Sequence, residues 1–347
     1  MIKSNIINNM PVIVILGPTA AGKSDLAVSL AKEIEKNRLG GYEGAEIISA
    51  DSRQVYEGLD IGTGKITKDE MCGVRHYCLD ITNPYISEVN KRFTVVDWQK
   101  CAEKAITEIA QRNKIPIICG GTGFYISTLI YGLEFPDIEI DMKEKNTLDT
   151  KTADELLMEL AKIDPRRAQD MSSNGDAKNI RRLVRAVLVA RELGKVPLMK
   201  SVTLDNGTKH KYKPLIFGLI LSDDVLKERI MTRILKRIDI GMLKEAERLH
   251  KNTSEKAGLS YERMDELGLE YRYLAQYLQG QLTKETLVST LATKIWQYAR
   301  RQKTWFKRDK NINWLNPTDP AVLKKMVNLI NTEIKQIEKE VHKALLC

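Results

Sequence analysis

The chain has 347 residues, 43% of them hydrophobic and 29% charged, which is enough for one large or two modest domains with a substantial core. Its formal net charge of +9 favours a polyanionic partner such as nucleic acid, although a basic protein without such a partner can carry the same charge. The five cysteines form no CxxC pair and no apolar run approaches the about 18 residues of a membrane helix, so we expect no disulfide framework, no structural zinc site, no membrane span and a cytoplasmic location.

Short apolar runs alternate with helical patterns over much of the chain. Runs rich in Ile, Val, Leu or Cys predict buried strands at residues 12–16, 46–50, 77–81, 115–119 and 215–221. Helical patterns separate several of these runs, notably at 23–36 and 97–112. Apolar strands that alternate with helices indicate a parallel sheet covered by helices on both faces, so we expect an α/β fold.

The segment 141–197 has a different character. It is polar, charged and helical in pattern, and it contains no strand candidate. Its two clearest helices are 152–163 and 178–193. We therefore interpret it as an all-helical insertion into an α/β core formed by residues 11–140 and 198–310.

The C-terminal third is helical in pattern almost to its end. Its candidate helices are 225–251, 284–308 and 321–346. Two prolines and several Asn and Asp residues predict a loop at 309–320. Residues 311–347 should thus form a C-terminal loop and helix.

The residues Gly-Pro-Thr-Ala-Ala-Gly-Lys-Ser at 17–24 fit the pattern GxxxxGK[ST], between a predicted strand and a predicted helix. Glycines let backbone N–H groups turn inward around an oxyanion, and the following helix adds its positive N-terminus. Lys23 adds a point charge, and Ser24 can help to hold Mg²⁺. A chance glycine-rich turn would not need this context, so the motif predicts a diphosphate or triphosphate site made by Gly17, Thr19, Ala20, Ala21, Gly22, Lys23 and Ser24.

The motif alone does not identify the phosphate compound. An ordinary P-loop NTPase has a second strand that ends in an acidic residue and helps to hold Mg²⁺. Here the predicted strand 115–119 runs instead into Gly-Gly-Thr-Gly. Asp51 and Asp80 follow other predicted strands and can take that role, so a nucleotide and another diphosphate both remain open.

Asp51 directly follows the predicted strand 46–50. Ligands of open α/β sheets bind at the carboxyl ends of the strands, so Asp51 should share a crevice with the phosphate loop. A carboxylate there can ligate Mg²⁺ or take a proton from an attacking amine, or it can merely cap the next turn. Gln54 can read an adenine edge through its amide, or it can be an ordinary surface residue.

Several motifs occur together in the order and spacing of one known family. They are the phosphate loop, Asp-Ser-Arg-Gln-Val-Tyr at 51–56, Asp-Ile-Gly-Thr-Gly-Lys at 60–65 and Gly-Gly-Thr-Gly-Phe-Tyr at 120–125, followed by Arg-Arg-Leu-Val-Arg at 181–185 and Arg-Arg-Gln-Lys-Thr-Trp at 300–305. Roughly residues 11–310 are covered, and an ordered set is far more specific than one motif. In these residues the chain resembles the tRNA dimethylallyltransferases of bacteria.

The resemblance implies a P-loop NTPase-like fold with a helical insertion that contacts tRNA. The P-loop would bind the diphosphate of dimethylallyl diphosphate rather than ATP, and the acceptor would be the N6 amine of adenosine 37 beside the tRNA anticodon. By position, Asp51 resembles the general base of the family, Thr19 and Lys23 resemble diphosphate ligands, and Arg233 resembles the arginine that holds the leaving group. These four are the predicted catalytic residues.

The resemblance also implies contacts with tRNA, and basic clusters in the sequence are candidates for them. Arg182 and Arg185 should share a helical face with Lys178, although a solvated face is the common alternative. A second basic cluster lies at 300–310, where Trp305 should pack rather than stack on a base. We expect Mg²⁺ held by Ser24, a monomer, and tRNA contacts from Asp51, Ser52, Arg53, Gln54, Thr122, Arg181, Arg182 and Arg185.

The chain departs from the family pattern in three places. The segment 35–44 looks longer than usual. Arg237 stands where an apolar residue, often Met, is expected. Gly-Leu-Glu-Tyr at 268–271 replaces the more familiar Gly-Tyr-Lys-Glu, so no substrate contacts are carried over to that segment.

Three other functions remain to be weighed. A small-metabolite kinase that uses ATP would explain the phosphate loop but neither the basic insertion nor the segment around Gln54. An isopentenyltransferase acting on free AMP would need the same chemistry but would leave the basic helices without a task. A non-catalytic RNA-binding protein with a degenerate site conflicts with intact Lys23, Ser24 and Asp51.

Overall fold

The structure is a computed structural model that describes residues 10–85, 92–133, 136, 138, 141–197, 212–251 and 258–345. The chain divides into two compact units. One comprises Met1–Gly132 with Leu204–Cys347, and the other is Leu133–Thr203. The expected insertion, 141–197, lies inside the second unit, and the expected C-terminal segment, 311–347, belongs to the first.

The first unit is built on a parallel sheet, as expected. Within the described residues the sheet has six strands in the order β3-β2-β4-β1-β5-β6, and every neighbouring pair is parallel. Its strands are β1 (Pro11–Leu16), β2 (Gly44–Ala50), β3 (His76–Tyr77), β4 (Lys114–Gly120), β5 (Lys213–Leu219) and β6 (Asn313–Leu315).

Helices cover both faces of this sheet. Because side chains alternate along a strand, Val12 and Val14 of β1 join one buried cluster while Ile13 and Ile15 join the other. Helices α2 (Lys23–Asn37) and α15 (Val322–Leu345) supply the second cluster, whereas α4 (Val95–Gln111) and α5 (Gly123–Tyr131) supply the first. Burial on both faces explains why the strands read as continuous apolar runs.

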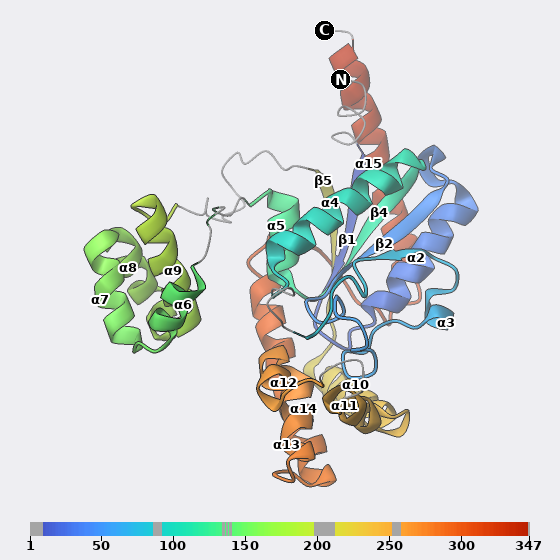
Figure 1. Cartoon of the computed structure of the whole chain (residues 1–347). Helices are drawn as coiled ribbons and strands as arrows, with labels where there is room; N and C mark the ends of the chain where they lie inside the picture. The colour runs from blue at the N-terminus through green and yellow to red at the C-terminus, as the bar shows by residue number, and fades with distance from the viewer. Residues whose placement is uncertain are drawn as a thin grey trace. The chain divides into compact units, whose positions relative to one another are not determined.

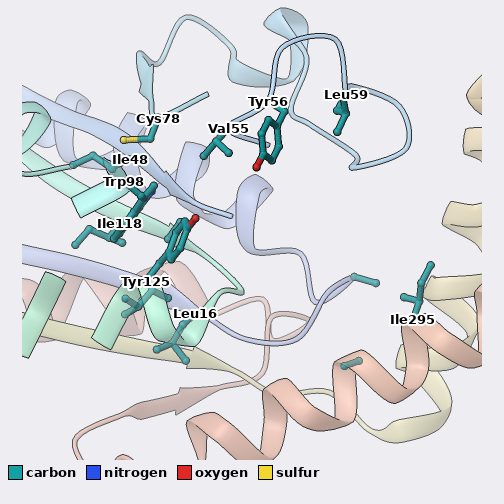
Figure 2. Packing of buried hydrophobic residues seen from close by; sticks show 14 of the residues in the cluster. Leu16, Ile48, Val55, Tyr56, Leu59, Cys78, Trp98, Ile118, Tyr125 and Ile295 are labelled. Carbon is teal, nitrogen blue, oxygen red and sulfur yellow. The ribbon is translucent and has the colours of Figure 1, made fainter. Parts of the chain in front are cut away.

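Trp98 of α4 anchors the first cluster, as Figure 2 shows. Its side chain is fully buried and stacks on Tyr125 of α5, with ring centroids 4.7 Å apart. The indole N–H donates to the carbonyl oxygen of Ser49 at 2.9 Å, which satisfies the polar end of the ring inside the core. This contact fixes α4 and α5 beside the carboxyl end of β2.

Three predicted boundaries were wrong. The strand expected at 77–81 is only His76–Tyr77, since Cys78 and Asp80 have left-handed backbones, with φ of 59° and 51°. The loop expected at 309–320 contains the edge strand β6, which pairs with β5. The helix expected at 225–251 breaks at Gly241, with φ of 110°, into α10 (Asp223–Asp239) and α11 (Met242–His250).

Helices α10 to α14 form a group that lies below the sheet in Figure 1. The remaining members are α12 (Tyr261–Leu267), α13 (Leu269–Leu278) and α14 (Lys284–Phe306), and the short α3 (Lys68–Met71) belongs to the same unit. Their apolar side chains, including Tyr271 and Ile295, are part of the first buried cluster. The group thereby brings its polar residues close to the strand ends.

The segment 35–44 completes α2 and then forms the 3-10 turn η1 (Leu39–Gly41). Gly40 has a φ of 59°, and a Cβ added there would lie 2.7 Å from Cδ1 of Ile334 on α15. This segment therefore packs against the C-terminal helix α15.

The second unit is helical throughout its described residues. It contains α6 (Met142–Asp149), α7 (Ala153–Ile163), α8 (Pro165–Ser173), η2 (Asp176–Lys178) and α9 (Ile180–Leu193). Leu156, Leu160 and Leu183 are among the residues of its own core.

The shared helical face predicted for Lys178, Arg182 and Arg185 was wrong. Lys178 ends the 3-10 turn that precedes α9. The side chain of Asn179 accepts a hydrogen bond from the N–H of Arg182 at 3.2 Å and so begins the helix after Lys178. Across the described residues of both units, no helix is long and apolar enough to cross a bilayer.

Candidate active site

The predicted phosphate loop forms a turn between β1 and α2. Gly17, Ala20 and Gly22 have positive φ, at 152°, 64° and 88°. A Cβ on Gly17 would lie 3.0 Å from the carbonyl oxygen of Leu219, so the close approach of β5 also requires glycine. In the described structure no side chain caps α2, whereas Thr94 caps α4. The first amides of α2 are therefore available to an anion.

A cavity of about 520 Å³ opens at this loop. Its walls come from the phosphate loop, from the segments after β2 and before α3, and from one face of α10. The predicted site residues that line it are Thr19, Ala20, Gly22, Lys23, Ser24, Asp51, Gln54 and Arg233. The sequence therefore identified eight of the 24 residues that line this cavity.

Lys23 and Arg233 give the cavity positive charge. Nζ of Lys23 donates to the carbonyl oxygen of Pro18 at 2.8 Å, and burial, reinforced by nearby Arg233, lowers the pKa of Lys23 to about 8. Burial and then Arg237 lower the pKa of Arg233 to about 10. Neither cation forms an ion pair with a carboxylate of the described residues. Two desolvated cations in one cavity indicate a site for an anion with several charged oxygens.

A second cavity of about 430 Å³ adjoins the first. Both are lined by Thr19, Lys23, Asp51, Thr63 and Gly121. The second cavity also reaches α13 and α14, where it is lined by Arg272, Tyr273, Lys294, Tyr298 and Arg301, and it includes Ser52 and Arg53. Cationic and aromatic side chains together suit a nucleotide, whose phosphates and base they can both contact.

Asp51 lies where the two cavities meet. Its Oδ1 accepts hydrogen bonds from the N–H of Arg53 at 2.8 Å and of Gln54 at 3.4 Å. None of the described residues hydrogen-bonds its Oδ2. One carboxylate oxygen thus caps the turn after β2, and the other is left for a substrate, so the two interpretations of Asp51 are compatible. Asp80, which pairs with Lys65, lines neither cavity within the described chain.

Gln54 and Thr122 support the backbone around Asp51. Oε1 of Gln54 accepts from Oγ of Ser49 at 3.2 Å, and its Nε2 donates to the carbonyl oxygen of Gly64 at 3.2 Å. Oγ1 of Thr122 accepts from the N–H of Ser52 at 3.1 Å, which ties the end of β2 to the end of β4. Among the described residues Thr122 lines neither cavity. Both side chains therefore already have partners within the protein.

Glu245 of α11 is a buried carboxylate that belongs to the residues shared with the family but had been given no role from the sequence. It accepts hydrogen bonds from three successive N–H groups, those of Asp60 at 3.0 Å, Ile61 at 2.7 Å and Gly62 at 2.9 Å. The hydroxyl of Tyr271 donates to it as well, at 2.7 Å. This carboxylate shapes the loop that carries Thr63 into both cavities.

The first cavity has the residues that a Mg²⁺ ion bound with a diphosphate would need. No group of three or more His, Cys, Asp and Glu residues in the described chain could hold a metal by itself. Mg²⁺, however, is commonly held by one or two protein oxygens together with substrate phosphates and water. Ser24 and Asp51 line the same cavity and fit that arrangement.

The other predicted tRNA contacts belong to the second unit, whereas every residue considered so far belongs to the first. Arg181 is exposed, and Arg182 is exposed and paired with Asp176. Arg185 is half-buried and donates to the carbonyl oxygen of Pro136 at 3.4 Å, and burial lowers its pKa. Arg181 is therefore exposed and forms no ion pair with the described residues, unlike Arg182.

Arginines of α10 are a further part of the site, and of these only Arg233 had been given a role from the sequence. Arg229, Arg233 and Arg237 lie at i, i+4 and i+8, so they share one helical face. Arg229 and Arg233 line the first cavity. Arg237 lines neither cavity within the described chain, and it donates instead to the carbonyl oxygen of Gly62.

A family model, curated proteins and solved structures that resemble this chain all point to one family. A family model described as IPP transferase matches residues 54–309. tRNA dimethylallyltransferase 2 of Treponema denticola is 41% identical over 308 residues, which cover 87% of this chain and 95% of that protein. tRNA dimethylallyltransferase of Bacillus subtilis is 34% identical over 316 residues, covering 90% and 92%. The crystal structure of the full-length tRNA isopentenylpyrophosphate transferase from Bacillus halodurans superposes with a TM-score of 0.66 at 31% identity, covering 96% of this chain and all of that one.

Proposed function

Because the chain belongs to the IPP transferase family, we propose that it transfers the dimethylallyl group of dimethylallyl diphosphate to an adenine amine of tRNA and releases diphosphate. The observation that carries this proposal is the pair of adjoining cavities. They share Thr19, Lys23 and Asp51, so two substrates can meet at the carboxylate of Asp51. Beside it lies the cationic cradle, by which we mean the phosphate loop with Lys23 and Arg233.

The first cavity suits the donor. The uncapped amides of α2, the ammonium of Lys23 and the guanidinium of Arg233 can surround a diphosphate. Charge develops on this group as the allylic C–O bond breaks, and donors already fixed in place stabilise that charge without reorganising. The breaking bond leaves an allylic carbon whose positive charge is delocalised, and the acceptor nitrogen attacks that carbon.

The second cavity suits the acceptor. We propose that it receives adenosine 37 of the anticodon loop, turned out of the base stack so that its N6 amine reaches the donor. The amine is a weak nucleophile because its lone pair is conjugated with the ring. Oδ2 of Asp51 is free to accept the N6 proton as the C–N bond forms, and a positioned base contributes roughly 10²–10⁴-fold.

Supporting roles follow for the remaining predicted residues. Mg²⁺, when bound with Ser24 and the diphosphate, supplies further positive charge to the leaving group. Gln54 and Thr122 hold the segments that present Asp51, as their hydrogen bonds indicate. Arg181, Arg182 and Arg185 provide tRNA phosphate contacts from the second unit, and the working enzyme is a monomer.

Incubation of the protein with unmodified tRNA and radiolabelled dimethylallyl diphosphate tests the proposal. Label should appear on an adenine next to the anticodon, and excess ATP should not reduce the transfer. Phosphoryl transfer from ATP to a small metabolite would replace this function with a kinase activity. Labelling of free AMP in preference to tRNA would identify an isopentenyltransferase of the nucleotide-specific type.

A further inference from the structure

Gln302 of α14 is a buried polar side chain with both ends of its amide satisfied by backbone groups. Oε1 accepts a hydrogen bond from the N–H of Thr19 at 2.9 Å. Nε2 donates to the carbonyl oxygen of Gly121 at 2.8 Å. Only 6% of the residue is exposed, so these two bonds take the place of the solvent that a primary amide would otherwise need.

The two partners of Gln302 lie in different turns of the site. Thr19 belongs to the phosphate loop after β1, and Gly121 follows β4. A Cβ added to Gly121 would lie 2.3 Å from Nε2 of Gln302 and 3.5 Å from the carbonyl oxygen of Gly17. The absence of a side chain at Gly121 therefore lets one amide bridge the two turns.

Helix α14 carries other residues of the site as well. Lys294, Tyr298 and Arg301 line the second cavity, and Gln302 follows directly on Arg301. Helix α14, which lines the second cavity, is thus hydrogen-bonded to the backbone of the phosphate loop. The link is specific, because it uses one N–H group of the cradle and leaves the amides at the start of α2 free.

We propose that Gln302 is a positioning residue that holds the phosphate loop, through the N–H of Thr19, against the turn at Gly121. This inference rests on the proposed function, in which the cradle binds the donor diphosphate. Removal of the bridge lets the loop relax, so donor binding weakens and the transfer slows. Thr19 and Gln302 also line the second cavity, but the predicted arginine contacts with tRNA lie elsewhere, so tRNA affinity should change much less than donor affinity.

Gln302→Met tests the proposal, since it keeps the length of the side chain and removes both hydrogen bonds. We expect the KM for dimethylallyl diphosphate and the Kd for inorganic diphosphate each to rise about 10-fold, while the Kd for tRNA stays within about twofold of wild type. Gln336→Met on α15, at an exposed glutamine, serves as the matched control and should change none of these values.

The diphosphate titration separates the two proposals. If wild-type protein fails to transfer the dimethylallyl group, the proposed function is wrong, whatever Gln302 does. If wild type transfers it and Gln302→Met leaves both donor values within about twofold, the positioning role is wrong. An equal loss of tRNA and donor affinity would also overturn it, because a general packing defect gives that result.

Should Gln302→Met not fold, Gln302→Glu takes its place. It loses the donor to Gly121 and adds a negative charge, so unchanged diphosphate affinity in that variant would contradict the proposal too.

Discussion

Arg237 of α10 and Glu270 of α13 form an ion pair in which Nη1 lies 3.3 Å from Oε1. Their side chains are only 11% and 13% exposed. Arg237 also donates to the carbonyl oxygen of Gly62 at 3.1 Å, next to the loop that reaches both cavities. Burial raises the pKa of the Glu270 carboxyl and Arg237 opposes that rise, so each charge depends on the other.

These two residues also stand at two of the places where we expect the chain to depart from the family pattern. By the resemblance an apolar residue is expected at position 237, and Glu270 stands in the segment 268–271, where Gly-Tyr-Lys-Glu is expected. They are 33 positions apart in the sequence and contact each other in space. The departures are therefore partners, since a charge at either position alone would be buried without compensation.

Arg237→Met should lower the free energy of unfolding by about 3 kcal/mol, because it leaves Glu270 buried without its partner. The double variant Arg237→Met/Glu270→Gln should recover most of that loss. Urea unfolding of wild type, both single variants and the double variant gives the coupling energy. A coupling below about 0.5 kcal/mol would show that the two charges act independently.

The loss in Arg237→Met should also depend on pH. A carboxyl whose pKa is raised in the folded state favours the protonated form, so its contribution to stability is retained at low pH and falls as pH rises. Arg237→Met should therefore be less destabilised at pH 5 than at pH 8. An equal loss at both values would mean that Glu270 stays solvated in the variant.

Asp51→Asn isolates the proposed proton transfer from the turn-capping role. The Asn side chain keeps an oxygen that can accept from the N–H of Arg53, but its amide cannot take up a proton. The single-turnover rate with tRNA bound should fall roughly 10²–10⁴-fold, while tRNA affinity is retained. Asp69→Asn, at an exposed carboxylate, should behave as wild type. A near-normal rate in Asp51→Asn would remove Asp51 as the base.

Local motifs explain why part of the site was predictable. The phosphate loop is one continuous segment whose glycines and lysine have a fixed spacing, and Asp51 follows a strand whose carboxyl end must lie at the same edge of the sheet. Both features need only short-range sequence information and the rule for parallel sheets. The parallel sheet itself was likewise evident from the apolar runs.

The roles that the sequence did not assign depend on contacts between distant positions. Gln302 and Thr19 are 283 residues apart, and Glu245 lies 185 residues from Asp60. In the sequence each is one polar residue on a helical pattern, with nothing to mark its partner. The strand β6 was missed for a related reason, since its three residues form an edge only because β5 lies beside them.

Gly64→Ala should disturb the ion pair from the side of the loop. Gly64 has a φ of 61°, and its added Cβ would lie 1.8 Å from Nη2 of Arg237, so the guanidinium must move away. Gly73→Ala is the matched control, because Gly73 also has a positive φ, of 82°, but no atom lies within 4 Å of the added Cβ.

Both substitutions add backbone strain of about 1 kcal/mol, because each places alanine at a positive φ. Gly64→Ala should therefore lower the free energy of unfolding by more than Gly73→Ala does. Thermal unfolding measures the difference. The extra loss should disappear in the Arg237→Met/Glu270→Gln background, where no ion pair remains to be displaced. If it persists there, the loop and not the ion pair is the source of the effect.

The low pKa of Lys23 predicts a pH dependence of donor binding. Burial lowers this pKa to about 8, so the ammonium is charged below that pH and increasingly neutral above it. A neutral amine attracts a diphosphate less, and therefore the KM for dimethylallyl diphosphate should rise above pH 8, by up to about tenfold per pH unit. Bound diphosphate favours the charged lysine, so kcat should change much less over the same range.

Lys23→Arg keeps its charge at every pH tested and should show a higher but flat KM between pH 7 and about 9. A flat KM in wild type would contradict the role of Lys23 as the titrating cation, whereas a rise that persists in Lys23→Arg would place the titration in another group.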